Sequence, residues 1–436
     1  MAFFFTCLFM ILVFWRPQEW LFPSLYGLPI LEGVTALAVL GLLMEASQKR
    51  LHFRTDMPHL YLLIGLWIAA ILSHVAHTYW EGMMWTIYPA FRLCFFTLLL
   101  MIVLDRPKRL RIVAWIMVLM SSIMAIHALM QQKLGYGFAG QPPILQWRPA
   151  LQRNVVRSWF FGIFSDPNDL AQILSASIPF AFVLTRRFSF FSFLLGFGFS
   201  VLLVAGIFAT YSRGGLVGLI VAVILMTARF LPPRLFATCS VLTLLIALMV
   251  IPYSKPYLDE SAHDRVVFWG EANWAFKENP IFGVGYGMLE EEYVGGERSV
   301  HNAFVWCYAS LGIVGYWFWY GLLQLSMIGA WRTMGVTRYS PDEEVKWLRR
   351  YAGLAMAALG SFAVSSYFLS RAFIFPLFFL IGMVGVIPYI GEKLLCPGRP
   401  LIRPVRDVLI YGTLGMLFSI VYIYLSIVIL NNVFYG

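Results

Sequence analysis

Long apolar runs recur along the whole chain and are separated by short segments that hold most of the charged residues. A helix that crosses a membrane needs about 20 mostly apolar residues. The runs therefore predict an all-α, polytopic transmembrane bundle of about 12 to 13 spans, in which the first run is short and the 302–331 run is long enough to be tilted or bent. The expected spans are residues 2–15, 29–45, 58–76, 86–104, 112–131, 167–185, 189–209, 214–228, 235–252, 302–331, 351–369, 373–391 and 408–432.

The composition agrees with this class. Of the 436 residues, 60% are hydrophobic and 12% are charged, whereas an average soluble domain has roughly 25% charged residues. A membrane β-barrel would instead show alternating segments of about ten residues. Two long polar loops, 132–166 and 253–301, interrupt the apolar runs. They divide the chain into N-terminal helices (1–131), a core (132–331) and C-terminal helices (332–436).

The distribution of lysine and arginine predicts the orientation. If the N-terminus is cytoplasmic, the inner segments hold 20 Lys and Arg, and the short outer segments hold only Arg16, Arg213 and Arg371. This bias is the positive-inside signal, and it explains the net charge of +10 without a nucleic-acid partner. Both long loops then face the outside. The inner segments are 46–57, 105–111, 186–187, 229–234, 332–350 and 392–407.

The outer stretch TYSRGGLVGL (210–219) places Arg213 at the start of an apolar span. Backbone N–H groups of Gly214 and Gly215, at a helix start that favours anions, could join the arginine in holding a phosphate-sized anion. A second interpretation is an arginine that extends to the membrane interface beside glycines that allow close helix packing. The stretch alone leaves both open.

The long loop 253–301 predicts an amphipathic helix on the outer interface. Ser261 or Asp264 is expected to cap the helix, and Pro280 to end it. Arg265 stands near its start, where a cation is unfavourable to the helix dipole, so helix stability does not explain it. One face would carry Val266, Trp269, Asn273 and Phe276, with Trp274 nearby.

The end of this loop and the preceding outer loop add further candidates. The stretch GVGYG (283–287) predicts a tight turn back to the membrane rather than a nucleotide site, because no strand precedes it. His301 and Asn302 stand directly before the 302–331 span. Arg157 precedes Asp166 and Pro167, which predict a capped helix start. We expect Arg213, Arg265 and His301 to lie close together, whereas Arg153 and Arg157 are either further site residues or solvated loop charges.

Four stretches in this order resemble the O-antigen ligase/polymerase superfamily of bacterial envelope polysaccharide assembly. They are RSWFFGIFSDPNDLA (157–171), TYSRGGLVGL (210–219), RVVFWGEANWAFKENPIFGVGYG (265–287) and HNAFVWCYASLGIVGY (301–316). The resemblance implies a membrane glycosyltransferase of the GT-C type in the bacterial inner membrane, with its active site facing the periplasm. Members of the family usually have twelve spans, so either the first of our thirteen does not cross or the C-terminus lies outside.

The resemblance also implies roles for individual residues. Arg213 and Arg265 would hold the pyrophosphate of an undecaprenyl-pyrophosphate-linked glycan donor, with Arg157 as a looser match, and His301 would act on the acceptor hydroxyl. Gly214, Gly215 and Asn302 complete the expected binding set. We expect no metal and no cofactor, because the arginines would neutralise the phosphates.

Several functions stay open. The acceptor would be lipid A-core for a ligase, a lipid-linked glycan for a polymerase, or a protein hydroxyl for a protein O-oligosaccharyltransferase. A lipid-linked glycan flippase or other transporter is an alternative of another class. Proton-coupled transporters carry acidic or histidine relays near the middle of the membrane, and the apolar runs here almost lack them.

Overall fold

The structure is a computed structural model, and it describes residues 1–25, 27–48, 54, 56–148, 152–228, 232, 235, 238, 260–292, 299–395 and 399–435. Apart from two isolated residues, the expected span at 235–252 lies outside this part of the chain. The helices and strands are α1 (Ala2–Trp15), α2 (Pro17–Trp20), η1 (Pro23–Leu25), α3 (Ile30–Ser47), α4 (Pro58–Val75), α5 (Trp80–Val103), α6 (Pro107–Leu134), η2 (Phe138–Gly140), β1 (Ile144–Arg148), β2 (Arg153–Arg157), η4 (Gly162–Phe164), α7 (Pro167–Ser177), η5 (Pro179–Val183), α8 (Phe190–Thr210), α9 (Arg213–Ala228), α11 (Glu260–Glu278), α12 (Leu289–Glu292), α13 (Ala303–Val336), α14 (Glu343–Ser365), η8 (Ser366–Phe368), α15 (Phe375–Gly385), α16 (Ile387–Leu395), η9 (Val405–Ile410) and α17 (Tyr411–Tyr435).

The prediction of an all-α, polytopic membrane protein is confirmed. Among the described residues, nine helices are long and apolar enough to cross a membrane. Two further apolar helices, α1 and α9, are shorter. The expected span at 167–185 is broken, because α7 ends at Ser177 and the 3₁₀-helix η5 follows it. Pro179 accounts for the break, since it has no N–H to continue the helix and clashes with the preceding turn.

Burial separates central helices from lipid-facing ones. The α15–α16 span is fully buried and the span beginning with α14 is 89% buried, whereas α3 is only 17% buried and α8 28%. Exposed apolar side chains such as Phe197 on α8 and Leu40 on α3 cover the peripheral helices. A soluble protein would hide such surface, so these faces are the ones that contact lipid.

One end of the bundle, which we call the cation-rich end, gathers the segments predicted to be cytoplasmic. Contacts among the described residues join five of the six: 54–57, 105–111, 186–187, 332–350 and 392–407. Their common location is what assignment to one side of the membrane requires. The linking contacts are Arg54 Nη1–Glu392 Oε2 (2.9 Å), Arg111 over the Trp347 ring (5.7 Å), Arg350 Nη2–Thr185 carbonyl (2.8 Å) and Arg332 Nη2–Asp407 Oδ1 (2.6 Å).

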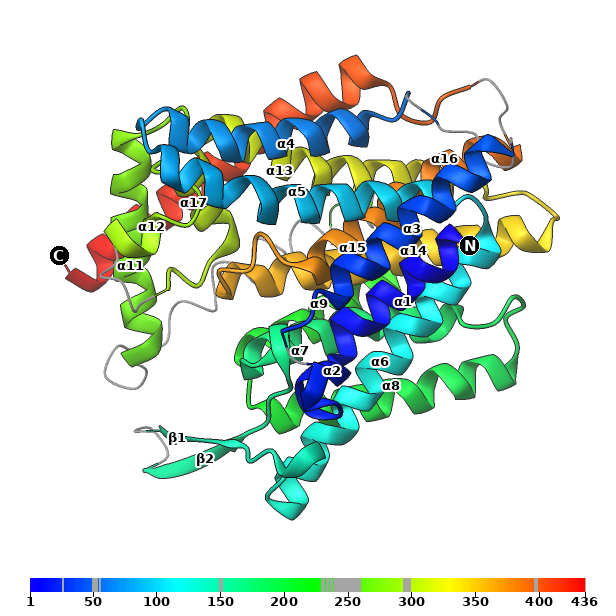
Figure 1. Ribbon diagram of the computed structural model, residues 1–436, viewed down its shortest axis with the longest axis horizontal. Helices are drawn as coiled ribbons and strands as arrows, with labels where there is room; N and C mark the ends of the chain where they lie inside the picture. The colour runs from blue at the N-terminus through cyan, green and yellow to red at the C-terminus, as the bar shows by residue number, and fades with distance from the viewer. Residues whose placement is uncertain are drawn as a thin grey trace.

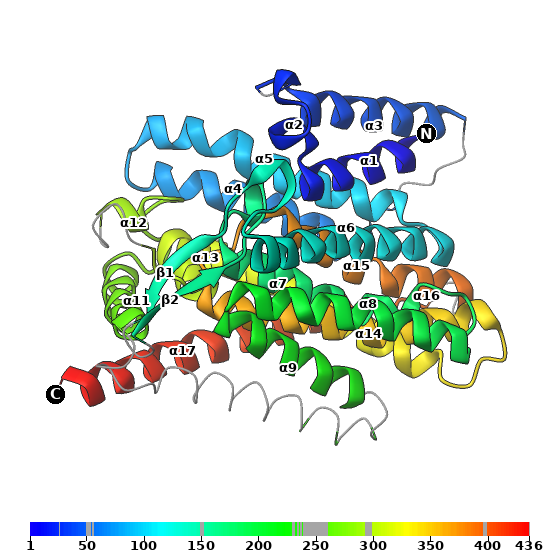
Figure 2. The same ribbon diagram turned by 90° about the horizontal axis from the view of Figure 1, so that it is seen from below.

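The opposite end, which we call the site end, gathers the loops predicted to be outside. The N-terminus lies at the cation-rich end and the C-terminus at the site end in both views (Figures 1 and 2). The chain therefore enters and leaves the bundle at different ends, which is one of the two alternatives expected for thirteen spans. The contacts that join the outer loops are His77 Nε2–Gly283 carbonyl (2.7 Å), Arg157 Nε–Thr210 carbonyl (3.1 Å), His301 N–Ser370 Oγ (2.7 Å) and Arg371 Nε–Asp169 Oδ1 (2.9 Å).

Two elements cover the site end. Helix α11 runs across the ends of the spans rather than along them (Figure 1), as expected for a helix on the outer interface. The antiparallel strands β1 and β2 form a hairpin that projects beyond the bundle (Figure 1). The sequence interpretation did not include this hairpin, which lies in the 132–166 loop. Alternating side chains turn Gln146 and Arg157 to one face and Leu145 and Val156 to the other, as in any paired strand.

Helix α13 is kinked, as the length of its apolar run suggested. Gly312 has φ 63° and ψ −171°, which only glycine adopts readily. The kink frees backbone groups that the turn after α11 then satisfies, since Val284 N donates to the Ala309 carbonyl (3.0 Å) and Ile313 N donates to the Pro280 carbonyl (2.8 Å). The end of α11 is therefore fixed to α13 by backbone hydrogen bonds.

Candidate active site

Three arginines from three different elements line one small cavity at the site end. The cavity has a volume of about 40 Å³. Arg157 comes from β2, Arg213 from the first residue of α9, and Arg265 from α11. The expectation that Arg213 and Arg265 lie close together is met by the geometry, and Arg157 lines the same cavity. The full lining is Gln146, Arg157, Asn168, Tyr211, Arg213, Gly214, Arg265, Phe368 and Leu369.

Arg157 is the most firmly held of the three. Its side chain is 8% exposed. Nε donates to the Thr210 carbonyl (3.1 Å), Nη1 to Gln146 Oε1 (2.9 Å) and Nη2 to Asn168 Oδ1 (2.9 Å). These three acceptors are neutral oxygens, and they fix the orientation of the planar guanidinium beside the cavity.

Arg213 and Gly214 reach the cavity from the start of α9, and Gly215 does not. Ser212 Oγ accepts a hydrogen bond from Gly215 N (3.1 Å), so the expectation of an uncovered N–H is wrong for this glycine. A Cβ on Gly215 would lie 2.3 Å from Ala171 Cβ, which shows that this glycine allows α9 to pack closely on α7. The packing interpretation of the SRGG stretch therefore holds for Gly215, while the anion-binding interpretation of Arg213 and Gly214 stays a prediction.

Helix α11 presents Arg265 from a rigid support. The helix already begins at Glu260, so the expected caps Ser261 and Asp264 lie inside it and that prediction is wrong. Trp269 is buried and its Nε1 donates to the Val300 carbonyl (2.7 Å). Asn273 Oδ1 accepts from the Tyr308 hydroxyl (2.5 Å). These contacts confirm the predicted inward face and tie α11 to the segment that carries His301.

His301 lies beside this group, close to Arg265 but not in the lining of the cavity. Its backbone has φ 49°, a left-handed conformation that costs most residues about 1–2 kcal/mol, and its N–H donates to Ser370 Oγ (2.7 Å). Burial of the imidazole, and then the nearby Arg265 guanidinium, lower the pKa of His301 to about 4. Asp166 opposes this shift and Arg371 adds to it. The ring is therefore neutral at pH 7.

Asn302 is buried, and its side chain caps α13. Its Oδ1 accepts hydrogen bonds from Phe304 N (3.1 Å) and Val305 N (3.2 Å). Asp166 performs the same function for α7, where its carboxylate accepts from Asn168 N (2.6 Å), as predicted. Asn302 thus contributes to the site by fixing the helix that follows His301.

The structure adds residues that the sequence interpretation did not assign to the site. Arg371 forms an ion pair with Asp169, whose side chain is 2% exposed (Nη2–Oδ2, 2.5 Å). Arg371 was one of only three basic residues in short outer segments, which is the signal that could have identified it. Tyr211 lines the cavity and also has a left-handed backbone (φ 50°). Within the described residues, no three His, Cys, Asp or Glu side chains are grouped to hold a metal ion.

The comparison with known families bears on this same region. Residues 198–320 match the family model described as O-Antigen ligase. This match supports the resemblance of this region to the O-antigen ligase/polymerase superfamily. A comparison with curated proteins finds none that matches the chain.

The O-antigen ligase region runs from α8 to the first part of α13, past the kink. It contains Arg213, Arg265 and His301, whereas Arg157 precedes it on β2. The family match supports an enzyme of the ligase or polymerase type with lipid-linked glycan substrates, and the apolar helices support a multi-pass membrane protein. The O-antigen ligase region thus supplies four of the nine residues that line the cavity, namely Tyr211, Arg213, Gly214 and Arg265.

Proposed function

We propose that the chain transfers a glycan from an undecaprenyl-pyrophosphate-linked donor to an acceptor hydroxyl at the periplasmic face of the bacterial inner membrane. The observation that carries the proposal is the convergence of Arg157, Arg213 and Arg265 on one cavity, at the end of the bundle opposite the cation-rich end. Arginine outside the predicted cytoplasmic segments has no anchoring function, and the planar guanidinium group matches phosphate oxygens in geometry and charge. A diphosphate is the anion that the donor supplies.

The arginines would act on the leaving group. Transfer breaks the bond between the anomeric carbon and the phosphate oxygen, so negative charge grows on the pyrophosphate in the transition state. Fixed cations and N–H groups aimed at that charge are typically the largest catalytic contribution. Removal of one such donor typically lowers kcat by about 10²–10³. In this proposal the arginines supply the neutralisation, and no metal is required.

His301 would act as general base on the acceptor hydroxyl. Its lowered pKa keeps the imidazole neutral, which a base must be. General base catalysis typically contributes a factor of about 10²–10⁴. Attack on the face opposite the pyrophosphate would invert the anomeric carbon. Arg371 and Asp169 would hold the segment beside His301, because Ser370 accepts the His301 N–H.

Three acceptors share this chemistry. Lipid A-core defines a ligase, a second lipid-linked glycan defines an O-antigen or exopolysaccharide polymerase, and a protein hydroxyl defines a protein O-oligosaccharyltransferase. We favour the first two on the family match. A lipid-linked glycan flippase would need a path for the headgroup between the spans, and the arginine cavity lies only at one end of them.

Two experiments test the proposal. Arg213→Ala, Arg265→Ala and His301→Ala should each abolish glycan transfer in cells while membrane insertion stays intact, and Arg153→Ala on the exposed part of β2 is the matched control. Transfer at the wild-type level by the Arg265→Ala protein would refute the assignment, and so would a requirement for Mg²⁺ that survives purification.

A deletion strain identifies the acceptor. Loss of long surface polysaccharide together with accumulated lipid-linked repeats indicates a polymerase. Polymer that is made but not attached to lipid A indicates a ligase. Normal surface polysaccharide with an unglycosylated protein would indicate the protein O-oligosaccharyltransferase instead.

A further inference from the structure

A groove at the cation-rich end has a lining that combines basic and apolar side chains. It has a volume of about 480 Å³ and lies between the turn that joins α13 to α14 and the segment that precedes α8. Four of its eight lining residues are lysine or arginine, and none is acidic. The lining consists of Phe188, Met334, Thr337, Arg338, Ser340, Lys346, Arg349 and Arg350.

Most of the positive charge in this groove is not neutralised by the described residues. Lys346 pairs with Glu343 (3.0 Å). Arg350 Nη2 donates only to the carbonyls of Thr185 (2.8 Å) and Arg186 (3.2 Å), and Arg349 Nη1 donates to the Arg338 carbonyl (3.4 Å). Arg350 Nε is buried and has no hydrogen-bond partner in the described part of the chain. The guanidinium groups of Arg338, Arg349 and Arg350 thus line a groove whose own lining holds no carboxylate, and Glu343, the partner of Lys346, acts on Arg350 from outside the lining.

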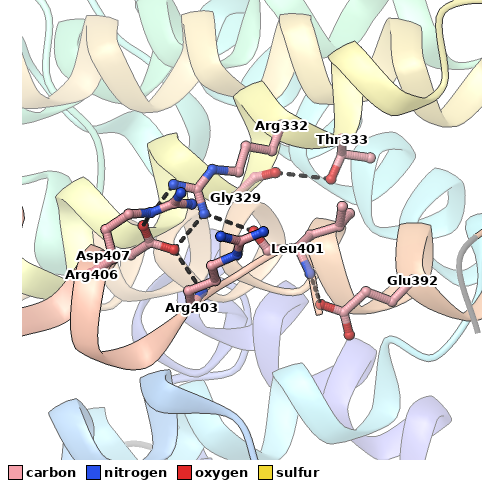
Figure 3. Close-up of polar contacts among 8 residues, drawn as sticks. All are labelled: Gly329, Arg332, Thr333, Glu392, Leu401, Arg403, Arg406 and Asp407. Carbon is pink, nitrogen blue, oxygen red and sulfur yellow. Dashed lines mark hydrogen bonds and ion pairs between the residues drawn. The ribbon is translucent and has the colours of Figure 1, made fainter. Parts of the chain in front are cut away.

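Other arginines at the same end are arranged differently. Figure 3 shows Arg332 and Arg406 directed at the buried carboxylate of Asp407, whose oxygens accept from Arg332 Nη2 (2.6 Å) and Arg406 Nε (3.0 Å). Arg54 likewise binds Asp56 and Glu392. The positive-inside rule requires basic residues on this side, but it requires neither a concave site nor the omission of acidic partners. The groove therefore needs a separate explanation.

The surroundings of the groove place it at the boundary between lipid and water. Phe188 in its lining is 58% exposed, and the nearby Tyr339 and Phe190 are 86% and 77% exposed. Exposed aromatic rings beside basic residues are typical of the membrane interface. An occupant would thus meet apolar surface on one side and guanidinium groups on the other.

We propose that this groove binds the headgroup of an acidic phospholipid in the leaflet at the cation-rich end. The phosphate would lie on Arg338, Arg349 and Arg350, and the glycerol and first acyl carbons would lie against Phe188 and Met334. The planar guanidinium group of arginine matches phosphate oxygens in geometry and charge, and basic pockets between transmembrane helices bind acidic headgroups. The site lies at the opposite end from the arginine cavity, so the proposal does not depend on the proposed function.

Native mass spectrometry of the full-length chain, released from vesicles that contain equal parts of phosphatidylglycerol and phosphatidylcholine, tests this proposal. The wild type should retain phosphatidylglycerol in preference to phosphatidylcholine. Each basic residue near an anionic surface contributes about fivefold in affinity. Arg349→Gln with Arg350→Gln should therefore weaken retention of phosphatidylglycerol by about 25-fold.

The control changes the same charge at the same end. Arg399→Gln with Arg403→Gln removes two exposed arginines outside the groove, and retention should stay within about twofold of the wild type. Because Arg350 also contacts the 185–186 backbone, Arg338→Gln serves as a milder variant and should weaken retention by about fivefold. Equal loss in the groove and control variants would overturn the proposal, as would equal retention of both lipids by the wild type. Displacement of the lipid by millimolar inorganic phosphate would also overturn it, since a small-anion site would then explain the groove.

Discussion

The kink in α13 provides the sharpest test of how the fold positions the site, through the substitution Gly312→Ala. Gly312 occupies a backbone region that is almost restricted to glycine (φ 63°, ψ −171°). A Cβ there would lie 2.2 Å from the Ile281 carbonyl oxygen and 2.5 Å from Phe282 N. Both neighbours are backbone atoms, so a change of rotamer cannot relieve the contacts.

The expected effect can be worked from these contacts. The disallowed backbone costs about 1–3 kcal/mol, and overpacking costs about 1–3 kcal/mol more. The sum is roughly 2–6 kcal/mol. For a chain of 436 residues, an unfolding entropy of about 2.1 cal/mol/K per residue converts this into a fall in Tm of about 2–6 °C.

Thermal unfolding in detergent, followed by intrinsic fluorescence, measures this change, and glycan transfer in cells provides a second readout. Glycan transfer should be lost to a greater extent than the small change in Tm would explain, because the strained turn moves α11, and with it Arg265, away from His301. Gly335→Ala in the same helix is the control, since a Cβ there meets nothing within 4 Å. Equal behaviour of the two variants would show that the kink does not position the site.

Three further predictions concern other parts of the molecule. Asp407→Asn should destabilise the protein by about 3 kcal/mol, near the low end for a broken buried ion pair because Arg332 is partly exposed. Glu343→Gln removes an exposed, solvent-screened pair and should leave stability almost unchanged; chemical denaturation measures both changes. As the pH falls, kcat/KM should drop with a midpoint near pH 4, because the base must be neutral and the pKa of His301 is lowered to about 4. A midpoint near pH 6.5 would contradict the burial of this ring. Tyr211→Gly should raise the free energy of unfolding by up to about 1 kcal/mol, because glycine adopts the left-handed backbone without strain. The same substitution should lower glycan transfer, because it removes a ring that lines the cavity. Unchanged transfer would show that the ring has no part in binding.

The helices could be predicted well from the sequence, because the length of an apolar run depends only on neighbouring residues. Every expected span within the described residues corresponds mostly to helix, although Pro179 breaks the span at 167–185, the span at 373–391 is divided into α15 and α16, and the span at 351–369 ends in the 3₁₀-helix η8. The break could have been predicted from the proline, and so could the cap on α9, since Ser212 directly precedes Arg213. The arrangement of basic segments was also predictable, because it follows from charge counting alone.

The details of the site were less accessible because they depend on contacts between distant residues. Arg371 and Asp169 are separated by 202 positions, and no local pattern indicates that they pair. The binding of the 280–285 turn to the kink at Gly312 likewise needs two segments to be placed first. The convergence of Arg157, Arg213 and Arg265 was expected from the family resemblance, whereas spacing along the chain left their grouping open.

The central claim is that arginines at the site end hold the departing diphosphate. The most direct measurement is the rate of glycan transfer by the purified chain in nanodiscs, from an undecaprenyl-pyrophosphate-linked donor, with Arg265→Gln compared with Arg153→Gln. The account predicts a fall of at least about 10²-fold for Arg265→Gln and a change within about twofold for Arg153→Gln. A wild-type rate with Arg265→Gln would contradict it.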